Sequence, residues 1–596
     1  MKQLTTDVLI VGGGGAGLRS AIAAAEAQPS LSIHLLSKVY PMRSHTVAAE
    51  GGAAAVTLQH DSIAAHFEDT VAGSDWLAEQ GVVDFFVKHA YQELVQLEHW
   101  GCPWSRQASG QVQVRRFGGM KTERTWFAAD KTGFHILHTL FQTSLKYPSI
   151  HRLDEYFLLD LLVHEQAIVG VLAIEIASGE LLQILASSVI LATGGAGRVF
   201  QFNTNGGIVT GDGMALAYRH GVALRDMEFV QYHPTGLPGS GILITEACRG
   251  EGGILLNKDG YRYLQDYGLG PETPLGQPQN KTMELGPRDK LSQAFWHEQQ
   301  QGRTIQHPQG DVVHLDLRHL GQRYLLERLP FICELAKAYV NIDPVTAPIP
   351  IRPAVHYTMG GILTDAHCAT SIRGLFAVGE CASVGLHGAN RLGSNSLSEL
   401  LVFGKVAGEQ AAAHCSQTKV SDAVMQELTD KAAGPIRQLR QGDGTEQWAD
   451  IRQQLAQTME QGCGIYRDEQ GLTASLLAIA DLKRRYQQLK VGDSGLAFNT
   501  ELLHALELGF SLDVAEAMCQ AALLRKESRG AHQRRDANYT KRNDKNFLQH
   551  SLAYYQEDQA PRIDWQAVDC SMMPPAARLY GDAAKQQAAS TSEKPV

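Results

Sequence analysis

The N-terminal part of the chain changes from one hydrophobic pattern to another within a short distance. Residues 7–11 (DVLIV) form a short, almost wholly apolar run, as a buried strand requires. The glycine-rich stretch 12–17 follows, and residues 18–25 then repeat apolar side chains at the spacing of one helix face. A second apolar run occupies residues 33–36. This order predicts a strand, a tight glycine turn, a helix and a second strand.

Two later apolar segments end in the same kind of turn. Residues 189–195 (VILATGG) and 374–380 (GLFAVGE) each pass from an apolar run into glycine. They are predicted to be further strands of the same sheet, so that the domain opening the chain resumes near residue 355. The stretch between about 237 and 353 is rich in glycine and proline. We interpret it as an inserted second domain that covers a ligand.

After about residue 416 the hydrophobic spacing becomes helical. One predicted helix face carries Leu472, Leu476, Ile479, Leu482, Tyr486 and Leu489. Asp513 and Glu516 resemble a capping box, which predicts that a helix begins there and continues through residues 517–524. This part of the chain is therefore predicted to be a helical bundle.

Composition narrows the possible functions. The chain has 596 residues and a net charge of −10, which argues against a nucleic-acid-binding protein. Its apolar runs are all shorter than the roughly 20 residues that a membrane-spanning helix needs. Nine widely spaced cysteines with no CxxC pair argue against a disulfide framework and against a zinc or iron–sulfur site in this chain. We therefore expect no metal ligands, and any iron–sulfur relay must lie on another chain.

The first glycine turn has the frame of a dinucleotide-binding motif. Gly12, Gly14 and Gly17 occupy the G-x-G-x-x-G positions, where they permit a tight turn, close approach of a pyrophosphate and close helix–strand packing. The alternative is a glycine-rich turn that only packs. The second strand ends in Ser37 and Lys38 and lacks the acidic ribose contact of NAD sites, so FAD is the better candidate.

The predicted fold class is α/β. It consists of a Rossmann-like FAD-binding domain with an inserted α+β capping domain, followed by a helical bundle and a small C-terminal domain. The predicted divisions are 1–236 and 354–415 for the two parts of the FAD-binding domain, 237–353 for the capping domain, 416–545 for the helical domain, and 546–596 for the C-terminal domain with a disordered tail.

Eight motifs in order along the chain resemble the flavoprotein subunits of fumarate reductases and succinate dehydrogenases. They are 43–52 (RSHTVAAEGG), 193–197 (TGGAG), 232–236 (YHPTG), 245–252 (TEACRGEG), 286–289 (GPRD), 356–361 (HYTMGG), 387–396 (HGANRLGSNS) and 527–532 (ESRGAH). The resemblance covers residues 5–580. The compact stretch 117–133 is similar to the bacterial quinol:fumarate reductase branch, whereas succinate dehydrogenases typically carry a longer loop here.

The resemblance implies a covalently bound FAD. His45 matches the histidine that is bonded to the 8α-methyl group of the flavin, although a lone histidine without this context is usually an ordinary polar residue. Such a bond retains the flavin and raises its reduction potential, so the protein tunes a cofactor that performs the redox chemistry. The other implied flavin-binding residues are Gly12, Gly14, Gly15, Gly17, Ser37, Lys38, Ser44, Thr46, Gly51, Gly52, Tyr156, Asp212, Tyr357, Glu380, Arg391, Ser396 and Leu397.

The resemblance also implies a site for the small dianions fumarate and succinate. Arg391 matches the carboxylate-binding arginine, and a guanidinium can hold a carboxylate with two parallel hydrogen bonds. His233 and His356 match substrate-binding histidines, with Thr245 beside them. A single arginine taken alone is more often part of a surface salt bridge.

Three further residues match the family's proton-transfer groups. Arg288 matches the proton donor, and Glu246 and Arg249 match the relay that recharges it; His233 is placed with them as a catalytic residue. The alternative for Glu246 and Arg249, three residues apart, is a surface ion pair on one helical turn. Cations at such a site would stabilise the negative charge that builds on the substrate during reduction.

The implied partners are an iron–sulfur subunit and, through it, membrane anchor subunits. Electrons from quinol would reach the flavin through the iron–sulfur subunit, at the cytoplasmic face of the bacterial inner membrane. Residues 525–545 hold eight Lys/Arg and only three acidic residues. Either this segment is a solvated face, or it contacts the region near the flavin and the iron–sulfur subunit.

Other functions remain as alternatives. A succinate dehydrogenase subunit would differ mainly in the preferred direction of the reaction. L-aspartate oxidase, a relative that holds FAD without the covalent link, is disfavoured by the intact motif around His45. A non-catalytic flavin-binding module would have no need for Arg288, Glu246, Arg249 and Arg391 together. The sequence therefore favours a fumarate reductase flavoprotein subunit of anaerobic respiration.

Overall fold

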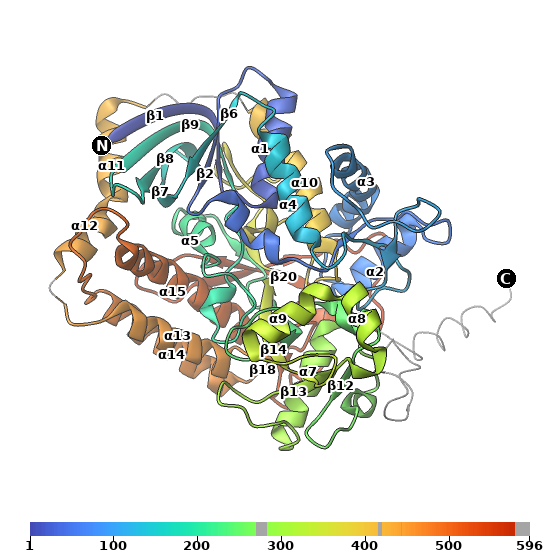
Figure 1. Cartoon of the computed structure of the whole chain (residues 1–596). Helices are drawn as coiled ribbons and strands as arrows, with labels where there is room; N and C mark the ends of the chain where they lie inside the picture. The colour runs from blue at the N-terminus through green and yellow to red at the C-terminus, as the bar shows by residue number, and fades with distance from the viewer. Residues whose placement is uncertain (270–282, 415–419, 443, 579–596) are drawn as a thin grey trace.

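The computed structural model describes residues 1–269, 283–414, 420–442 and 444–578. The C-terminal tail that the sequence predicts to be disordered lies outside these residues. Figure 1 shows a large sheet at one end of the molecule, a second α/β region at the other end, and C-terminal helices alongside both.

The largest sheet has seven strands and confirms the predicted α/β class. Its order is β6-β2-β1-β9-β8-β7, and β16 also pairs with β9. The pairs β6–β2, β2–β1, β1–β9 and β9–β16 are parallel, whereas β8 pairs antiparallel with both β9 and β7. The strands are β1 (Lys2–Val11), β2 (Ile33–Ser37), β6 (Ile150–Asp154), β7 (Tyr156–His164), β8 (Ala167–Glu175), β9 (Leu181–Leu191) and β16 (Leu375–Ala377).

The end of β9 brings three distant glycine turns to one edge of this sheet. Val189–Leu191 pair on one side with β1 and on the other side with β16. All three strands are parallel, so the turns that follow them, at residues 12–17, 193–197 and 379–380, leave the sheet at the same carboxyl edge. Open parallel sheets bind their ligands at this edge. The strands predicted from the apolar runs are confirmed.

Two helices that are far apart in the sequence cover one face of the sheet. Helix α1 (Gly15–Ala27) follows the first glycine turn, and α10 (Asn395–Ala413) packs along it. The hydroxyl of Ser20 on α1 donates to the carbonyl oxygen of Gly404 on α10 at 2.9 Å, which requires close backbones. Figure 1 shows α1 beside α4 (Thr132–Ser144). A segment nearly 400 residues along the chain thereby reaches the first glycine turn.

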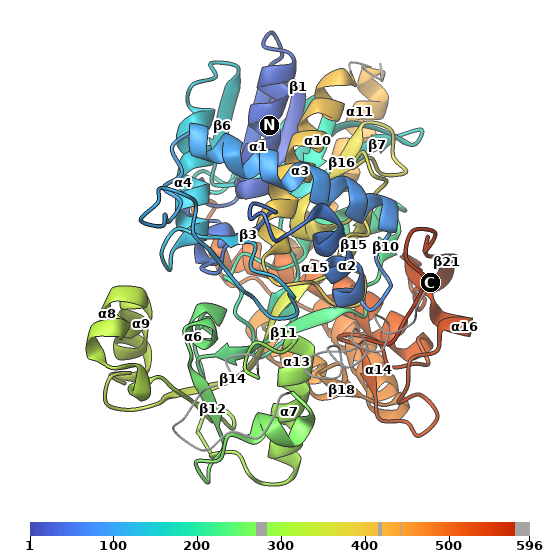
Figure 2. The ribbon, with the colours of Figure 1, turned by 90° about the vertical axis from the view of Figure 1, so that its right-hand side faces the viewer.

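A second, four-stranded sheet lies at the other end of the molecule. Its order is β11-β14-β13-β12, and β14 (Ile349–Thr358) is long enough to link two regions. The first half of β14 pairs with β13 (Val313–Asp316) and its second half with β11 (Val230–Gly236). Figure 2 shows this sheet with β12 (Ile254–Leu256), α6 (Glu246–Gly250), α7 (Arg288–Gln300), α8 (Gln322–Arg328) and α9 (Pro330–Val340).

Residues 237–351 of this region have an apolar cluster of their own. Such a separate core is what an inserted domain needs. The bounds given above for the individual domains stay predictions.

The C-terminal part is helical as predicted, with one error in a helix start. Helix α15 runs over Thr500–Leu524, and its N-cap is Asn499, whose side chain accepts from the amide of Leu502 at 2.8 Å. Asp513 and Glu516 are therefore not a capping box. They lie inside the helix because the apolar run continues upstream of them, and both carboxylates pair with Lys483. The other helices are α11 (Asp422–Ala432), α12 (Gly434–Gln441), α13 (Trp448–Gly462) and α14 (Glu469–Tyr486).

Candidate active site

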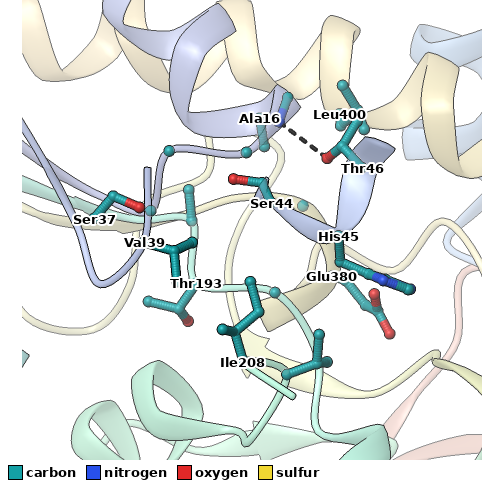
Figure 3. Close-up of a pocket in the computed structure, with 18 of the residues that line it drawn as sticks. Ala16, Ser37, Val39, Ser44, His45, Thr46, Thr193, Ile208, Glu380 and Leu400 are labelled. Carbon is teal, nitrogen blue, oxygen red and sulfur yellow. Dashed lines mark hydrogen bonds between the residues drawn. The ribbon is translucent and has the colours of Figure 1, made fainter. Parts of the chain in front are cut away.

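A cavity opens at the carboxyl edge of the large sheet. We call it the nucleotide cavity; Figure 3 shows side chains from several distant segments facing into it. Most of the predicted flavin-binding residues line it. They are Gly12, Gly14, Gly15, Ser37, Lys38, Ser44, His45, Thr46, Tyr156, Asp212, Tyr357, Glu380, Ser396 and Leu397.

The first glycine turn brings the backbone close to the cavity. Gly12 has φ +120°, and a Cβ built on it would lie 2.1 Å from the carbonyl oxygen of Ala192. Only glycine fits there. The amide of Gly15, at the N-terminus of α1, donates to the hydroxyl of Thr46 at 3.1 Å. The free amides and the positive end of the helix dipole suit a pyrophosphate.

Three predicted glycines do not line the cavity. Gly17 packs α1 against the first turn, because its Cβ would meet the carbonyl oxygen of Gly12 at 1.9 Å. Gly51 and Gly52 lie beside Phe117 and Trp126, and their predicted contact with the cofactor stays a prediction. They allow the loop after His45 to pass under the short strand β5 (Thr125–Trp126), which is a packing role.

His45 lies on the wall of the cavity in a short 3₁₀ helix, His45–Ala48. The amide of Gly206 donates to its Nδ1 at 3.3 Å, so Nε2 is the ring nitrogen left for a ligand. Burial lowers the pKa of His45 to about 4, so the imidazole is neutral at pH 7. Figure 3 shows His45 and Glu380 at the same part of the cavity.

At another part of the cavity wall, Lys38 is held by two carboxylates. Its Nζ lies 2.8 Å from Asp212 and 2.7 Å from Glu507. Burial opposes the charge on Lys38, but these carboxylates raise its pKa. Glu507 belongs to α15, so the helical part of the chain holds a residue of the cavity wall. Sequence reasoning missed Glu507 because it lies 469 residues from Lys38.

Beside the cavity lies a group of polar side chains, all buried except the half-buried His356, that we call the polar cluster. It comprises Gln231, His233, Glu246, Arg249, Arg288, His356 and Arg391. The cluster borders the nucleotide cavity because His356 lines that cavity and its ring centroid is 5.1 Å from that of His233. Sequence positions more than 150 residues apart thus meet at one point, as the resemblance implies.

Two arginines of the cluster flank one carboxylate. Arg288, the first residue of α7, donates from Nε to Oε2 of Glu246 at 2.9 Å. Arg249 places Nη2 3.6 Å from the same oxygen. The amide of Gly118 donates to the other oxygen of Glu246. Burial alone would raise the pKa of Glu246, but the two arginines lower it, so this carboxylate is ionised at pH 7.

Gln231 links the two arginines that the sequence assigns to different roles. Its Oε1 accepts from Nη1 of Arg288 at 3.1 Å and from Nη2 of Arg391 at 3.1 Å. Its amide nitrogen donates to the side chain of Asn390 and to the carbonyl oxygen of Arg391. Sequence reasoning missed Gln231. A signal was present, since it lies two residues before His233 on β11 and alternate residues of a strand share a face.

The two histidines have neighbours that hold their rings. Thr235 places its hydroxyl 3.1 Å from Nδ1 of His233, and Thr204 places its hydroxyl 2.8 Å from Nδ1 of His356. Burial, and next the charge of Arg288, keep the pKa of both histidines well below the ordinary value. Thr245 lies beside the cluster as predicted, directly before Glu246. It is also the N-cap of α6, because its hydroxyl accepts a hydrogen bond from the amide of Ala247.

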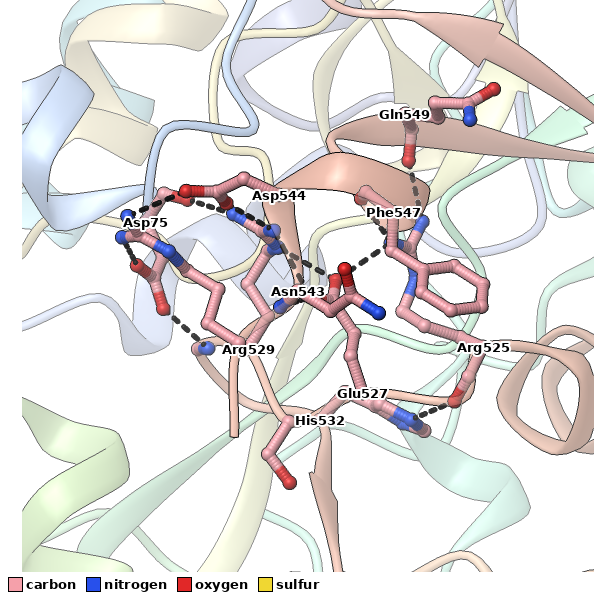
Figure 4. A network of polar contacts seen from close by, with 12 residues as sticks. Asp75, Arg525, Glu527, Arg529, His532, Asn543, Asp544, Phe547 and Gln549 are labelled. Atoms are coloured by element: carbon pink, nitrogen blue, oxygen red, sulfur yellow. Dashed lines mark hydrogen bonds and ion pairs between the residues drawn. The ribbon is translucent and has the colours of Figure 1, made fainter. Parts of the chain in front are cut away.

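Three of the arginines in residues 525–545 are not a solvated face. Arg525, Arg529 and Arg534 are at most 1% exposed. Figure 4 shows Arg525 and Arg529 in a network with Glu527, and Arg529 also reaches Asp75 and Asp544. The amide of Ala531 donates to the carbonyl oxygen of Ala389 at 2.9 Å, two residues before Arg391. This segment braces the loop that carries Arg391.

Comparisons with known proteins agree with this geometry. A family model described as an FAD binding domain matches residues 7–397, and another, described as the fumarate reductase flavoprotein C-terminal domain, matches residues 452–580. A fumarate reductase flavoprotein subunit of Serratia sp. is 63% identical over 598 aligned residues, covering 100% of both chains. The chain belongs to the fumarate reductase flavoprotein family. The predicted family and its FAD-binding domain are confirmed.

Other fumarate reductase and succinate dehydrogenase relatives refine this placement. A chain in the solved structure of a quinol-fumarate reductase with menaquinol molecules is 62% identical, with a TM-score of 0.94, covering 97% of this chain and 100% of that one. A succinate dehydrogenase flavoprotein subunit of Rickettsia bellii is 40% identical over 601 aligned residues, covering 96% of this chain and 98% of its own. The difference in identity favours the fumarate reductase branch. Across the described residues, no helix has the length and apolar character to cross a membrane.

Proposed function

We propose that this chain is the catalytic subunit of a quinol:fumarate reductase, which reduces fumarate to succinate and can run the reverse reaction. The observation that carries the proposal is the polar cluster, in which Arg288, Glu246, Arg249 and Arg391 meet beside the nucleotide cavity. Bound FAD would supply the exchange of a hydride with the carbon–carbon double bond of the substrate. The residues of the chain bind and orient the dianion and move the proton.

The substrate carboxylates would bind to Arg391, His233, His356 and Thr245. Arg391 is 4% exposed, and its ordered partners are the neutral groups Ser396 and Gln231. Burial lowers the pKa of Arg391 to about 10, which still leaves it protonated at neutral pH. A buried cation with a free charge attracts a dicarboxylate strongly, because water screens it little.

Arg288 would donate a proton to the substrate, and Glu246 and Arg249 would then supply Arg288 with a new proton. Glu246 Oε2 lies between the two guanidinium groups, at 2.9 Å from Arg288 and 3.6 Å from Arg249. Burial lowers the pKa of Arg249, which makes its proton easier to release. The order Arg249, Glu246, Arg288 is thus a chain of proton donors and acceptors that ends at the substrate site. The surface ion-pair alternative requires exposed side chains, and Glu246 and Arg249 are at most 2% exposed.

The FAD would be bonded through its 8α-methyl group to His45. The geometry fits this assignment, since an imidazole alkylated on Nε2 keeps a lone pair on Nδ1. That lone pair is the acceptor that the Gly206 amide already contacts. The positive φ of Gly12, the helix N-terminus at Gly15 and the cavity between them suit the pyrophosphate.

Electrons would arrive from quinol through an iron–sulfur subunit, and anchor subunits would hold the complex at the cytoplasmic face of the inner membrane. The support for this is the close similarity to a chain of a quinol-fumarate reductase that was solved with menaquinol. This assembly explains how a chain of this family could use a quinone.

The direct test is activity of the complex purified with its partners. We expect fumarate reduction with a low-potential quinol and succinate oxidation with a high-potential quinone. A complex with bound flavin and neither activity would contradict the proposed reaction, and the ratio of the two rates gives the preferred direction.

The covalent link has a separate test in His45→Ser. We expect this variant to retain FAD that acid extracts, and to lose succinate oxidation before fumarate reduction, because a flavin without the tether has a lower reduction potential. The measurement is flavin fluorescence of the polypeptide on a denaturing gel. Fluorescence that survives in the variant would refute the assignment of His45.

A further inference from the structure

The guanidinium of Arg391 is held without a carboxylate. Its Nη1 donates to the hydroxyl of Ser396 at 2.6 Å and its Nη2 to Gln231 at 3.1 Å. In the part of the chain that the structure describes, no acidic side chain forms an ion pair with it. Arg288 differs, because it is bound directly by Glu246. The two arginines of the polar cluster are therefore held by different physical means.

An aromatic ring takes the place of the carboxylate at Arg391. The guanidinium carbon lies 4.3 Å from the centre of the Tyr357 ring. A cation over a ring face is attracted by the negative face of the π system, and its charge is not neutralised. Tyr357 also lines the nucleotide cavity, so this ring separates the flavin site from the carboxylate-binding group.

Two side chains outside the predicted site fix the Tyr357 ring. Its hydroxyl donates to Oε2 of Glu399 at 2.9 Å, and Nε2 of His387 lies 2.8 Å from the same oxygen. The rings of Tyr357 and His387 meet edge to face, with centroids 5.4 Å apart. All three side chains are at most 8% exposed. A buried carboxylate that accepts from two donors is strongly ordered, and it adds electron density to the phenol that it binds.

The elements explain why the unit is rigid. Tyr357 is near the end of β14, and Glu399 lies in the first turns of α10. His387 belongs to the loop of Arg391, which the amide of Ala531 also contacts through Ala389. A strand, a helix and a braced loop thus meet at one carboxylate oxygen.

We propose that Glu399 and His387 are positioning residues for substrate binding: they fix the ring of Tyr357, which holds the guanidinium of Arg391 in place and leaves its charge available for a substrate carboxylate. This inference rests on the proposed function, in which Arg391 binds the substrate. It adds two residues that touch neither substrate nor flavin in that proposal.

The test compares two substitutions of Glu399 in the purified complex. Glu399→Gln keeps an oxygen that can accept from Tyr357, whereas Glu399→Leu has a similar size and no acceptor. The readouts are the dissociation constant of malonate, a dicarboxylate that cannot be reduced, and kcat and KM for succinate. Flavin content is measured in every variant. Glu516→Leu, which removes a carboxylate on the distant helix α15, is the matched control.

We expect Glu399→Leu to weaken malonate binding at least tenfold and to raise KM more than it lowers kcat. Glu399→Gln and Glu516→Leu should stay within about threefold of the unaltered complex, with the same flavin content. Where Glu399→Leu yields no flavin-loaded protein, Tyr357→Phe removes the same hydrogen bond and should weaken malonate binding at least threefold.

Three results would overturn the inference. One is unaltered malonate affinity in flavin-loaded Glu399→Leu, or in Tyr357→Phe if the leucine variant does not fold. Another is an equal loss in Glu399→Gln and Glu399→Leu, which would assign the effect to charge and not to positioning. Arg391→Gln separates this inference from the proposed function: if that variant binds malonate normally, the substrate assignment of Arg391 itself is wrong.

Discussion

The nucleotide cavity and the polar cluster are neighbours that are built in different ways. The cavity is shaped mainly by backbone: three glycine turns leave one edge of a parallel sheet, and Gly12 leaves no room for a side chain. The polar cluster is built from side chains that converge from β11, β14, α6, α7 and the loop before α10. A backbone site depends on local sequence, whereas a converging site depends on every element that contributes to it.

This difference teaches where each region is vulnerable. A change in the glycine turn should remove the cofactor and leave the polar cluster in place. A change in the cluster should leave the flavin bound and alter substrate binding or proton transfer. The four predictions below separate the two regions, beginning with the largest expected effect.

Arg288→Lys should separate chemistry from binding. Lysine keeps the positive charge but loses the planar fork that contacts both Glu246 and Gln231. We expect turnover with fumarate to fall roughly 10³-fold, the range of a lost acid catalyst. Flavin content and malonate affinity should change little. Turnover at the unaltered rate would remove Arg288 as the proton donor.

Gln231→Leu should disturb both arginines of the cluster at once. The substitution removes the oxygen that accepts from Arg288 and from Arg391. The loss of these buried bonds costs about 1–3 kcal/mol, so kcat/KM for succinate should fall roughly 10- to 100-fold. The control is Gln183→Leu on β9, which breaks a buried bond to Thr429 of α11. Equal effects of the two variants would show that Gln231 acts only through general stability.

Gly12→Ala tests the backbone region alone. The new methyl group would lie 2.1 Å from the carbonyl oxygen of Ala192, at a φ that side chains rarely adopt. We expect the flavin content of the purified protein to fall below a tenth of the unaltered value. Gly81→Ala, where a Cβ would meet nothing within 4 Å, should bind flavin normally. Normal flavin content in Gly12→Ala would show that the turn tolerates a side chain.

Acid should weaken the fold through the histidines of the polar cluster. Burial and the charge of Arg288 keep the pKa of His233 and His356 well below 6.5 in the folded chain. As the pH falls below 6.5, these imidazoles therefore bind protons in the unfolded chain but stay neutral in the folded chain. The contribution of the two neutral imidazoles to the free energy of unfolding is complete above about pH 6.5 and is lost as the pH falls. From pH 7 to 5 each imidazole should cost about 2 kcal/mol of unfolding free energy.

The measurement is denaturant unfolding at several pH values for the unaltered chain and for His356→Asn. The variant should show the smaller loss of stability between pH 7 and 5. Identical pH dependence of the two proteins would contradict the neutral state of His356.

Much of the backbone region could be predicted from sequence, because its signals are local. An apolar run followed by glycines predicts a strand and its turn, and β1, β9 and β16 were predicted in this way. The capping box at Asp513 failed because local spacing cannot show whether an apolar run continues a helix upstream.

The converging region could be predicted only through resemblance. Nothing in the spacing of Glu246, Arg288 and Arg391 shows that they meet, since tertiary structure brings them together. Glu399 and Glu507 were missed for the same reason: each acts on a residue more than 40 positions away.

The most direct test of the account is a crystal structure of the flavin-loaded complex with bound malonate. We expect one carboxylate of malonate to accept hydrogen bonds from Arg391 and His356, the guanidinium of Arg288 to face the ligand, and the flavin to be bonded to His45. Malonate bound away from these groups, or a flavin whose ring lies far from the polar cluster, would contradict the central claim that a cluster of cations holds a dicarboxylate beside a tethered flavin.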